Sequence, residues 1–199
     1  MKLLLGLASV IALASSAFAA GPEIGQPAPN FVLKDTTGKE VSLAEYKGKF
    51  VVLEWVNYGC PFVKKHYDSH SMQKLQADET AKGVVWLSIC SSAPGKQGNF
   101  SPEDAAAMTK EYGSAATAYL LDSDGKVGAL YDAKTTPDMY IINPAGNLIY
   151  KGAIDDQPSP DPSTLAVATN YVKLALSEAM ADKPVSNPQT KSYGCSVKY

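Results

Sequence analysis

The chain has 199 residues, of which 45% are hydrophobic and 19% are charged. This composition excludes a disordered, collagen-like or coiled-coil protein. The 18 basic residues are all lysines and face 20 acidic residues. Without arginine or a basic cluster, the chain lacks the contacts typical of nucleic-acid binding, so we expect no nucleic-acid partner.

Residues 1–19 have the pattern of a bacterial secretory signal peptide. Lys2 precedes an apolar run over residues 3–14 that is too short to span a bilayer, and Ala17 and Ala19 are small residues at the two positions that a signal peptidase reads. We expect cleavage after Ala19 and a location in the periplasm or outside the cell, without stable membrane insertion. Paired thiols persist as disulfides in such an oxidising compartment.

The predicted elements alternate between strands and helices in the domain at residues 20–182. Two runs, 50–56 and 84–89, are apolar at nearly every position, which is typical of strands covered on both faces. Strands are expected at 31–33, 40–42, 50–56, 84–89, 118–121, 139–142 and 148–150. Helices are expected from residue 61 over about 15 residues, at 101–112, as a short turn at 127–131, and at 162–181. Residues 183–199 form a polar tail, and the pattern predicts an α/β layered domain.

Four stretches carry a resemblance to a known family. They are Gly25, Ala28, Pro29 and Phe31; Gly38-Lys39 with residues 41–43 and 47–49; residues 55–61 (WVNYGCP); and Thr136-Pro137-Asp138. On these residues the chain resembles the thioredoxin superfamily over roughly residues 24–181. Within it, the chain is similar to the peroxiredoxin-like, alkyl hydroperoxide reductase–thiol-specific antioxidant (redoxin) branch. The resemblance implies a thioredoxin-like three-layer α/β fold, with a mixed central sheet, helices on both faces and an N-terminal β-hairpin extension.

The reactive motif departs from both better-known versions of the family. Thioredoxins carry two cysteines separated by two residues, whereas here Cys60 is present and Val63 takes the second place. True peroxiredoxins have a proline seven residues before the reactive cysteine and a threonine or serine three before it, where this chain has Leu53 and Asn57. They also use an arginine, which is absent. The chain is therefore a variant with a single motif cysteine.

Cys60 is predicted to be the nucleophile. It lies at a strand end immediately before a helix, whose free N–H groups and partial positive charge favour a thiolate. Such positions lower a cysteine pKa from about 8.5 into the range of roughly 3.5–7.5. The thiolate is the reactive form in disulfide exchange and in peroxide reduction. An inert buried cysteine is the alternative.

The other two cysteines have open assignments. We expect Cys195, in the tail, to pair with Cys60 and to serve as the resolving thiol; a static disulfide is the alternative. Cys90 ends a predicted strand, which suits a small buried side chain. It is also a possible alternative thiol, because functional residues gather at the ends of parallel strands. Three cysteines allow three pairs, and the sequence does not choose among them.

Several further residues are candidates because of the resemblance. Thioredoxins place a buried acid at the position of Glu54, six residues before the cysteine, where it relays protons; a solvated or lysine-paired glutamate is the alternative. Thr136-Pro137 resembles the family's cis-proline loop, which binds peptide, and an ordinary trans proline is the alternative. Asn57 and Pro61, beside Cys60, complete the candidate binding set.

His66 and His70 are one helical turn apart and are weak candidates for a metal site; surface histidines are the alternative. We expect no cofactor. The function expected is a secreted or periplasmic thiol-disulfide oxidoreductase, or a peroxiredoxin-like antioxidant protein. It would act on a protein disulfide or a peroxide, with an external dithiol or thioredoxin-like protein as reductant. A non-catalytic binding module and a copper carrier are the alternatives.

Overall fold

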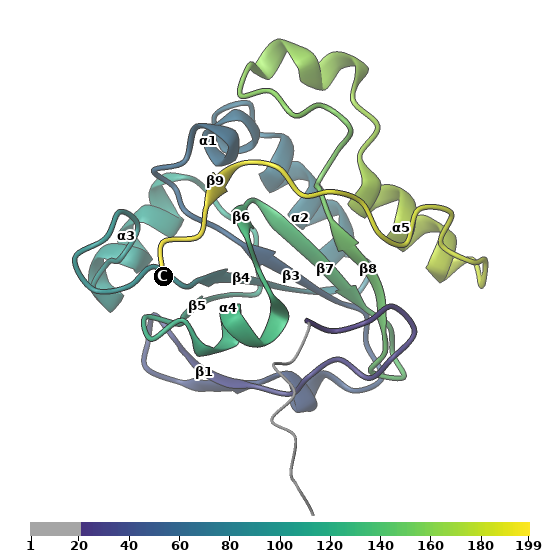
Figure 1. Cartoon of the computed structure of the whole chain (residues 1–199), viewed down its shortest axis with the longest axis horizontal. Helices are drawn as coiled ribbons and strands as arrows, with labels where there is room; N and C mark the ends of the chain where they lie inside the picture. The colour runs from purple at the N-terminus through teal and green to yellow at the C-terminus, as the bar shows by residue number, and fades with distance from the viewer. Residues whose placement is uncertain (1–20) are drawn as a thin grey trace, which may run out of the picture.

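The computed structural model describes residues 21–199 (Figure 1). The predicted signal peptide therefore lies outside the described residues. The strands are β1 (Val32–Asp35), β2 (Glu40–Ser42), β3 (Val51–Trp55), β4 (Val85–Cys90), β5 (Ala118–Leu121), β6 (Thr135–Thr136), β7 (Asp138–Ile142), β8 (Leu148–Gly152) and β9 (Cys195–Ser196). The α-helices are α1 (Pro61–Asp68), α2 (Ser71–Thr80), α3 (Pro102–Glu111), α4 (Lys126–Tyr131) and α5 (Tyr171–Met180). Leu43–Tyr46 and Pro162–Val167 are 3₁₀ helices.

Seven strands form the central sheet in the order β2-β1-β5-β4-β3-β7-β8. The inner strands β3, β4 and β5 are parallel, whereas β7 and β8 at one side and the hairpin of β1 and β2 at the other pair antiparallel. Every residue of β3, β4 and β7 is buried, because these strands are covered on both faces. The mixed α/β sheet and its N-terminal hairpin confirm the expected fold class.

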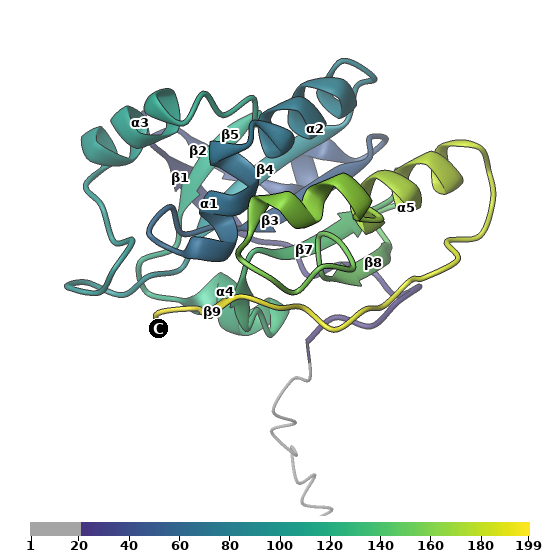
Figure 2. The same ribbon diagram turned by 90° about the horizontal axis from the view of Figure 1, so that it is seen from above.

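The two faces of the sheet are covered unequally. Side chains of α1, α2, α3 and α5 pack on one face, in a core that includes Trp86, Tyr67 and Leu176. Helix α4 and the 3₁₀ helix at Leu43–Tyr46 cover the other face, around Trp55 and Tyr131. Figure 2 shows α1, α2, α3 and α5 on one side of the sheet and α4 on the other. No helix in the described part of the chain is long and apolar enough to cross a bilayer.

Two predicted helices are wrong in their continuity. The helix after Pro61 is divided into α1 and α2, because His70 adopts the left-handed conformation with φ 59°. The Ser69 hydroxyl donates to the carbonyl of Lys65 at 2.7 Å. In a longer helix this carbonyl would accept a backbone N–H, so the hydroxyl satisfies the end of α1. The helix expected at 162–181 is divided in the same way, since the Asn170 side chain caps the start of α5.

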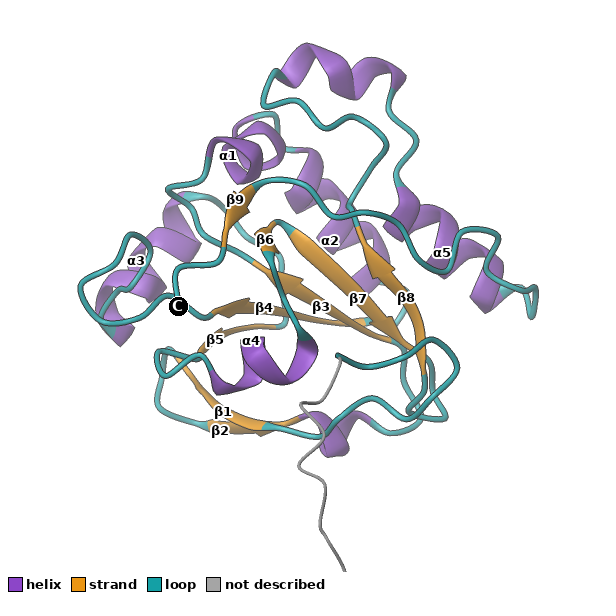
Figure 3. Cartoon of the chain, in the orientation of Figure 1, coloured by secondary structure: helices purple, strands orange, loops and turns teal. Residues whose placement is uncertain are grey.

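The C-terminal tail is an ordered part of the domain. It follows α5, runs beside β8, passes between α1 and β6 as β9, and ends near α4 (Figure 1). Two backbone hydrogen bonds join the tail to Lys151 of β8. Lys151 N–H donates to Pro188 O at 3.0 Å, and Thr190 N–H donates to Lys151 O at 3.0 Å. Apart from the short strand β9, the tail is loop (Figure 3). Composition suggested only a polar tail, and the structure brings it to the edge at which β3 ends.

Candidate thiol site at the start of helix α1

The turn between β3 and α1 fixes the position of Cys60. Cys60 N–H donates to Asn57 O at 2.9 Å, and Gly59 N–H donates to the Asn57 side chain at 2.9 Å. The Asn57 amide donates in turn to Gln97 O at 3.0 Å. Cys60 is the residue before the first turn of α1, and Pro61 occupies the first helical position. Asn57 and Pro61, which were predicted to bind a ligand, therefore shape the backbone that holds the Cys60 sulfur.

Cys195 lies beside Cys60 because strand β9 pairs with β6. In this antiparallel pair Cys195 is opposite Thr136, and Ser196 is opposite Thr135. The Cys60 thiol donates to the carbonyl oxygen of Thr136 at 3.1 Å. The Thr136-Pro137 peptide bond is cis, as the motif predicts. Thr136 is therefore in contact with both Cys60 and Cys195. All three cysteines are free thiols.

The close approach of the tail requires glycine at position 194. Gly194 has φ 137°, and a Cβ added to it would lie 2.1 Å from Thr136 O. Any side chain would push the tail away from β6, so the Gly-Cys sequence of the tail fits this contact. Cys60 is 0% exposed in this arrangement, and Cys195 is partly exposed. The observed conformation is thus a closed one, in which the sulfur of Cys60 is covered.

The two thiols have opposite acidities. Burial raises the pKa of Cys60, but hydrogen bonds from the Cys195 thiol, the Thr136 side chain and backbone N–H groups outweigh it, so the pKa falls below the ordinary value of 9.0. The buried Thr136 hydroxyl has no hydrogen-bond partner within the described residues, so it is free to donate to a thiolate. Burial, followed by the hydrogen bond with Cys60, raises the pKa of Cys195 to about 11. Cys60 is therefore the thiol that ionises first.

Cys90 forms its hydrogen bond with a different segment. Its side chain is buried and donates to Gly98 O at 3.2 Å, inside the loop that follows β4. Cys60 has its hydrogen-bond partners in Cys195, Thr136 and Val63, and Cys90 is not among those in residues 21–199. These contacts are those of a small buried side chain, which is one of the two roles predicted for Cys90.

Glu54 is fully buried within a cage of donors. Its carboxylate accepts hydrogen bonds from Trp86 at 2.8 Å, Ser88 at 3.0 Å, Tyr67 at 3.0 Å and Gln76 at 3.1 Å. Burial raises the pKa of Glu54 although these four donors oppose it. The expected burial is therefore present, and a solvated or lysine-paired glutamate is excluded. Cys60 is not a hydrogen-bond partner of Glu54 among the described residues, so its role as a proton relay stays a prediction.

The two histidines lie in different environments. His66 is 1% exposed on α1, whereas His70 is exposed at the break between α1 and α2. The one-turn spacing needs a continuous helix, and the left-handed residue at 70 ends it. The expectation of two surface histidines is wrong for His66. Across residues 21–199, no group of three or more His, Cys, Asp or Glu side chains is arranged to hold a metal ion.

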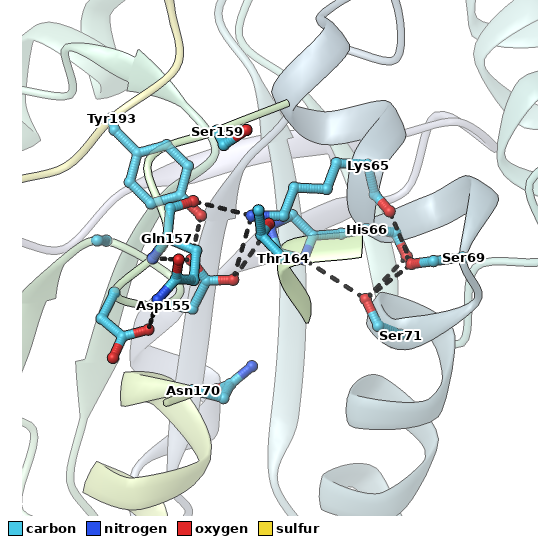
Figure 4. A network of polar contacts seen from close by, with 12 residues as sticks. Lys65, His66, Ser69, Ser71, Asp155, Gln157, Ser159, Thr164, Asn170 and Tyr193 are labelled. Atoms are coloured by element: carbon cyan, nitrogen blue, oxygen red, sulfur yellow. Dashed lines mark hydrogen bonds and ion pairs between the residues drawn. The ribbon is translucent and has the colours of Figure 1, made fainter. Parts of the chain in front are cut away.

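A buried polar cluster near the site was missed by sequence reasoning. It consists of Lys65 and His66 on α1, Asp155 after β8, and Tyr193 in the tail (Figure 4). The position of Tyr193, two residues before Cys195, was the available signal. Nothing in local spacing marks Lys65 or Asp155, because their burial depends on the packing of segments far apart in the chain.

The chain is similar in sequence to a known family and to known proteins. The family model described as "AhpC/TSA family" matches residues 24–151, more than half of the chain. Thiol-disulfide oxidoreductase ResA of Bacillus subtilis is 31% identical over 125 residues, which cover 63% of this chain and 64% of that protein. The chain thus matches less than two thirds of the length of this relative.

Solved structures extend the likeness over more of the chain. The crystal structure of an uncharacterized conserved protein from Geobacillus kaustophilus is 31% identical with a TM-score of 0.77, over 89% of this chain and 92% of that chain. The thioredoxin domain of a thiol-disulfide oxidoreductase from Bacteroides vulgatus is 21% identical, with a TM-score of 0.52 over 73% of this chain and 96% of that chain, and shows the fold alone. The fold is thioredoxin-like, and the chain belongs to the AhpC/TSA family.

Proposed function

We propose that this protein is a thiol-disulfide oxidoreductase in which Cys60 is the nucleophile and Cys195 is the resolving thiol. One observation carries the proposal: strand β9 places Cys195 opposite Thr136, whose carbonyl accepts the hydrogen bond of the Cys60 thiol. The lowered pKa of Cys60 supports its role as nucleophile, and the raised pKa of Cys195 supports its role in the second step. The likeness to a relative named thiol-disulfide oxidoreductase supports this reading.

The proposed reaction exchanges two electrons. The Cys60 thiolate attacks one sulfur of a substrate disulfide, so a bond forms to Cys60 and the other substrate sulfur leaves as a thiolate. Cys195 then loses its proton and attacks the Cys60 sulfur. The Cys60–Cys195 disulfide forms, and the second substrate sulfur leaves as a thiolate. Substrate is reduced, the protein is oxidised, and an external dithiol restores the two thiols.

Access to Cys60 requires the tail to move. Cys60 is 0% exposed, and the strand pair that covers it has only two residues on each side. Opening also breaks the hydrogen bonds that join Val197, Lys198 and Tyr199 to Lys134, Ala93 and Ala133. Such an opening is local and costs less than global unfolding. We therefore assign the closed form to the resting reduced state, and we expect substrate to enter when β9 separates from β6.

The test uses four proteins: the wild type and the Cys60→Ser, Cys195→Ser and Cys90→Ser variants. Each is mixed with glutathione disulfide, alkylated and mapped by mass spectrometry. We expect a Cys60–Cys195 disulfide in the wild type and in Cys90→Ser, and a trapped glutathione adduct on Cys60 in Cys195→Ser. Unreduced glutathione disulfide with the wild type, or full activity of Cys60→Ser, would refute the proposal.

Hydrogen peroxide gives a second arm of the same test. Peroxide would oxidise Cys60 to a sulfenic acid with release of water, and Cys195 would condense with it to the same disulfide, with release of a second water. The chain has no arginine to stabilise that reaction. We expect disulfide exchange to be the faster of the two reactions, and equal or faster turnover of peroxide would reassign the substrate.

Secretion remains part of the proposal. The apolar run at residues 3–14 and the small residues Ala17 and Ala19 support cleavage after Ala19. Expression in a bacterium, followed by mass spectrometry of the periplasmic fraction, should find a mature chain that starts at Ala20. A full-length chain in the cytoplasm would contradict it.

A further inference from the structure

A buried polar cluster connects the two segments that carry Cys60 and Cys195. Lys65 is on α1, five residues after Cys60, and Tyr193 is two residues before Cys195. Between them lies Asp155, in the loop after β8. Figure 4 shows the side chains of Lys65 and Tyr193 converging on Asp155. The cluster therefore joins the helix of one sulfur to the tail of the other.

Asp155 is the centre of the cluster. Its Oδ2 atom is 3.7 Å from the Lys65 ammonium and 3.8 Å from His66 Nε2. Its Oδ1 atom accepts hydrogen bonds from the Tyr193 hydroxyl and from Gln157 N–H, the latter at 2.9 Å. The Lys65 and Asp155 side chains are 0% and 1% exposed. A buried carboxylate that is held in this way is a rigid acceptor for the tyrosine.

Tyr193 makes three kinds of contact with this cluster and with α1. Its hydroxyl donates to Asp155, its ring lies 5.7 Å below the Lys65 ammonium, and its ring centroid is 5.9 Å from that of Phe62 in an edge-on arrangement. Burial and the neighbouring Asp155 raise the pKa of Tyr193, so the hydroxyl stays protonated and remains a donor. Tyr193 is thus the anchor of the tail on α1.

The anchor lies next to the only short strand of the tail, in which Cys195 pairs with Thr136. Two paired residues hold a strand weakly on their own. A substrate sulfur bonded to Cys60 would take the space in which Cys195 now lies, so the tail has to leave and return in each cycle. The rate of the second step then depends on how strongly the tail docks.

We propose that Tyr193 is a positioning residue for the resolving step, and that the Asp155 carboxylate beside Lys65 holds it so that Cys195 returns to Cys60. This inference rests on the proposed function and extends it to residues outside the thiol pair. Hydrogen bonds to charged groups change an equilibrium by about tenfold or more. Removal of the Tyr193 hydroxyl should therefore slow the attack of Cys195 on a mixed disulfide by roughly tenfold.

The test compares the wild type with Tyr193→Phe and with the control Tyr171→Phe. Tyr171 begins α5 beside the same loop, and its hydroxyl makes no hydrogen bond within residues 21–199. Each protein reacts with 5,5′-dithiobis(2-nitrobenzoate) under stopped flow. The first release of thionitrobenzoate reports attack on the reagent, and the second reports closure of the Cys60–Cys195 disulfide.

We expect Tyr193→Phe to leave the first phase unchanged or faster and to slow the second phase about tenfold, with Tyr171→Phe like the wild type in both phases. An unchanged second phase in Tyr193→Phe overturns the inference. Release of a third equivalent, from buried Cys90, also overturns it, because that result assigns the effect to a loosened core. A wild type that releases a single equivalent would instead refute the proposed function, so the two failures are distinguishable.

Discussion

The buried ion pair of Lys65 and Asp155 makes a strong prediction about stability. The substitution Asp155→Asn keeps the shape and the acceptor oxygen for Tyr193, but it removes the negative charge. Lys65 Nζ would keep its hydrogen bond to Gln157 O at 2.8 Å and would lose its counter-charge inside the core. Removal of one partner from a buried pair costs about 3–5 kcal/mol. This is a large part of the roughly 5–15 kcal/mol that stabilises a typical domain.

Urea unfolding of the reduced proteins measures this effect. The double variant Lys65→Met/Asp155→Asn removes both charges, so it should recover most of the loss. Asp78→Asn is the matched control, because Asp78 forms an exposed pair with Lys74 at 2.9 Å and its loss should leave the urea midpoint unchanged. Equal midpoints for Asp155→Asn and Asp78→Asn, or a double variant as unstable as the single one, would refute the reasoning.

Four more outcomes follow from the site. Oxidation to a Cys60–Cys195 disulfide closes a loop of 136 residues (195 − 60 + 1) and should stabilise the protein against urea by up to about 5 kcal/mol; identical midpoints for the oxidised wild type and Cys195→Ser would contradict the pairing. Alkylation of Cys60 by iodoacetamide should persist to lower pH than that of a free thiol, and Cys195→Ala should move the profile to higher pH because it removes a hydrogen bond to the thiolate. Burial raises the pKa of Glu54 above 4.5, so the folded state retains a proton that the unfolded state releases, and stability is lost as pH rises through the raised pKa. Glu54→Gln should abolish this part of the pH dependence of the free energy of unfolding. Parallel plots of that free energy against pH for the wild type and Glu54→Gln would refute this prediction. Cys90→Ala should leave the rate of glutathione disulfide reduction unchanged, because Cys90 is hydrogen-bonded away from the pair.

Much of the sheet could be predicted from local patterns. All seven strands of the central sheet lie within two residues of their expected bounds. The apolar runs of β3 and β4 mark strands covered on both faces, and Pro61 marks the first helical position of α1. Such signals depend on a few neighbouring residues, so they can be read without a structure. The position of Cys60 before a helix belongs to this group.

The helix ends show where local patterns stop being sufficient. The apolar spacing after Pro61 continues through both α1 and α2, so it contains no sign of the break. The left-handed residue His70 and the Ser69 hydroxyl bonded to Lys65 O divide the segment. Helix propensity is a weak preference, and side-chain bonds to the backbone override it.

Local sequence patterns and the family resemblance were enough to predict an α/β domain of the redoxin type with a cysteine before its first long helix. The expectation that Cys195 pairs with Cys60 came from the sequence, but only the tertiary structure shows strand β9 beside β6, the hydrogen bond of Cys90 to Gly98, and the buried pair of Lys65 and Asp155 with the partly buried Tyr193. Apart from the bond of Cys90, these arrangements join residues separated by tens of positions along the chain. Their energies come from packing, burial and pairing between distant segments, which no periodicity within one segment encodes.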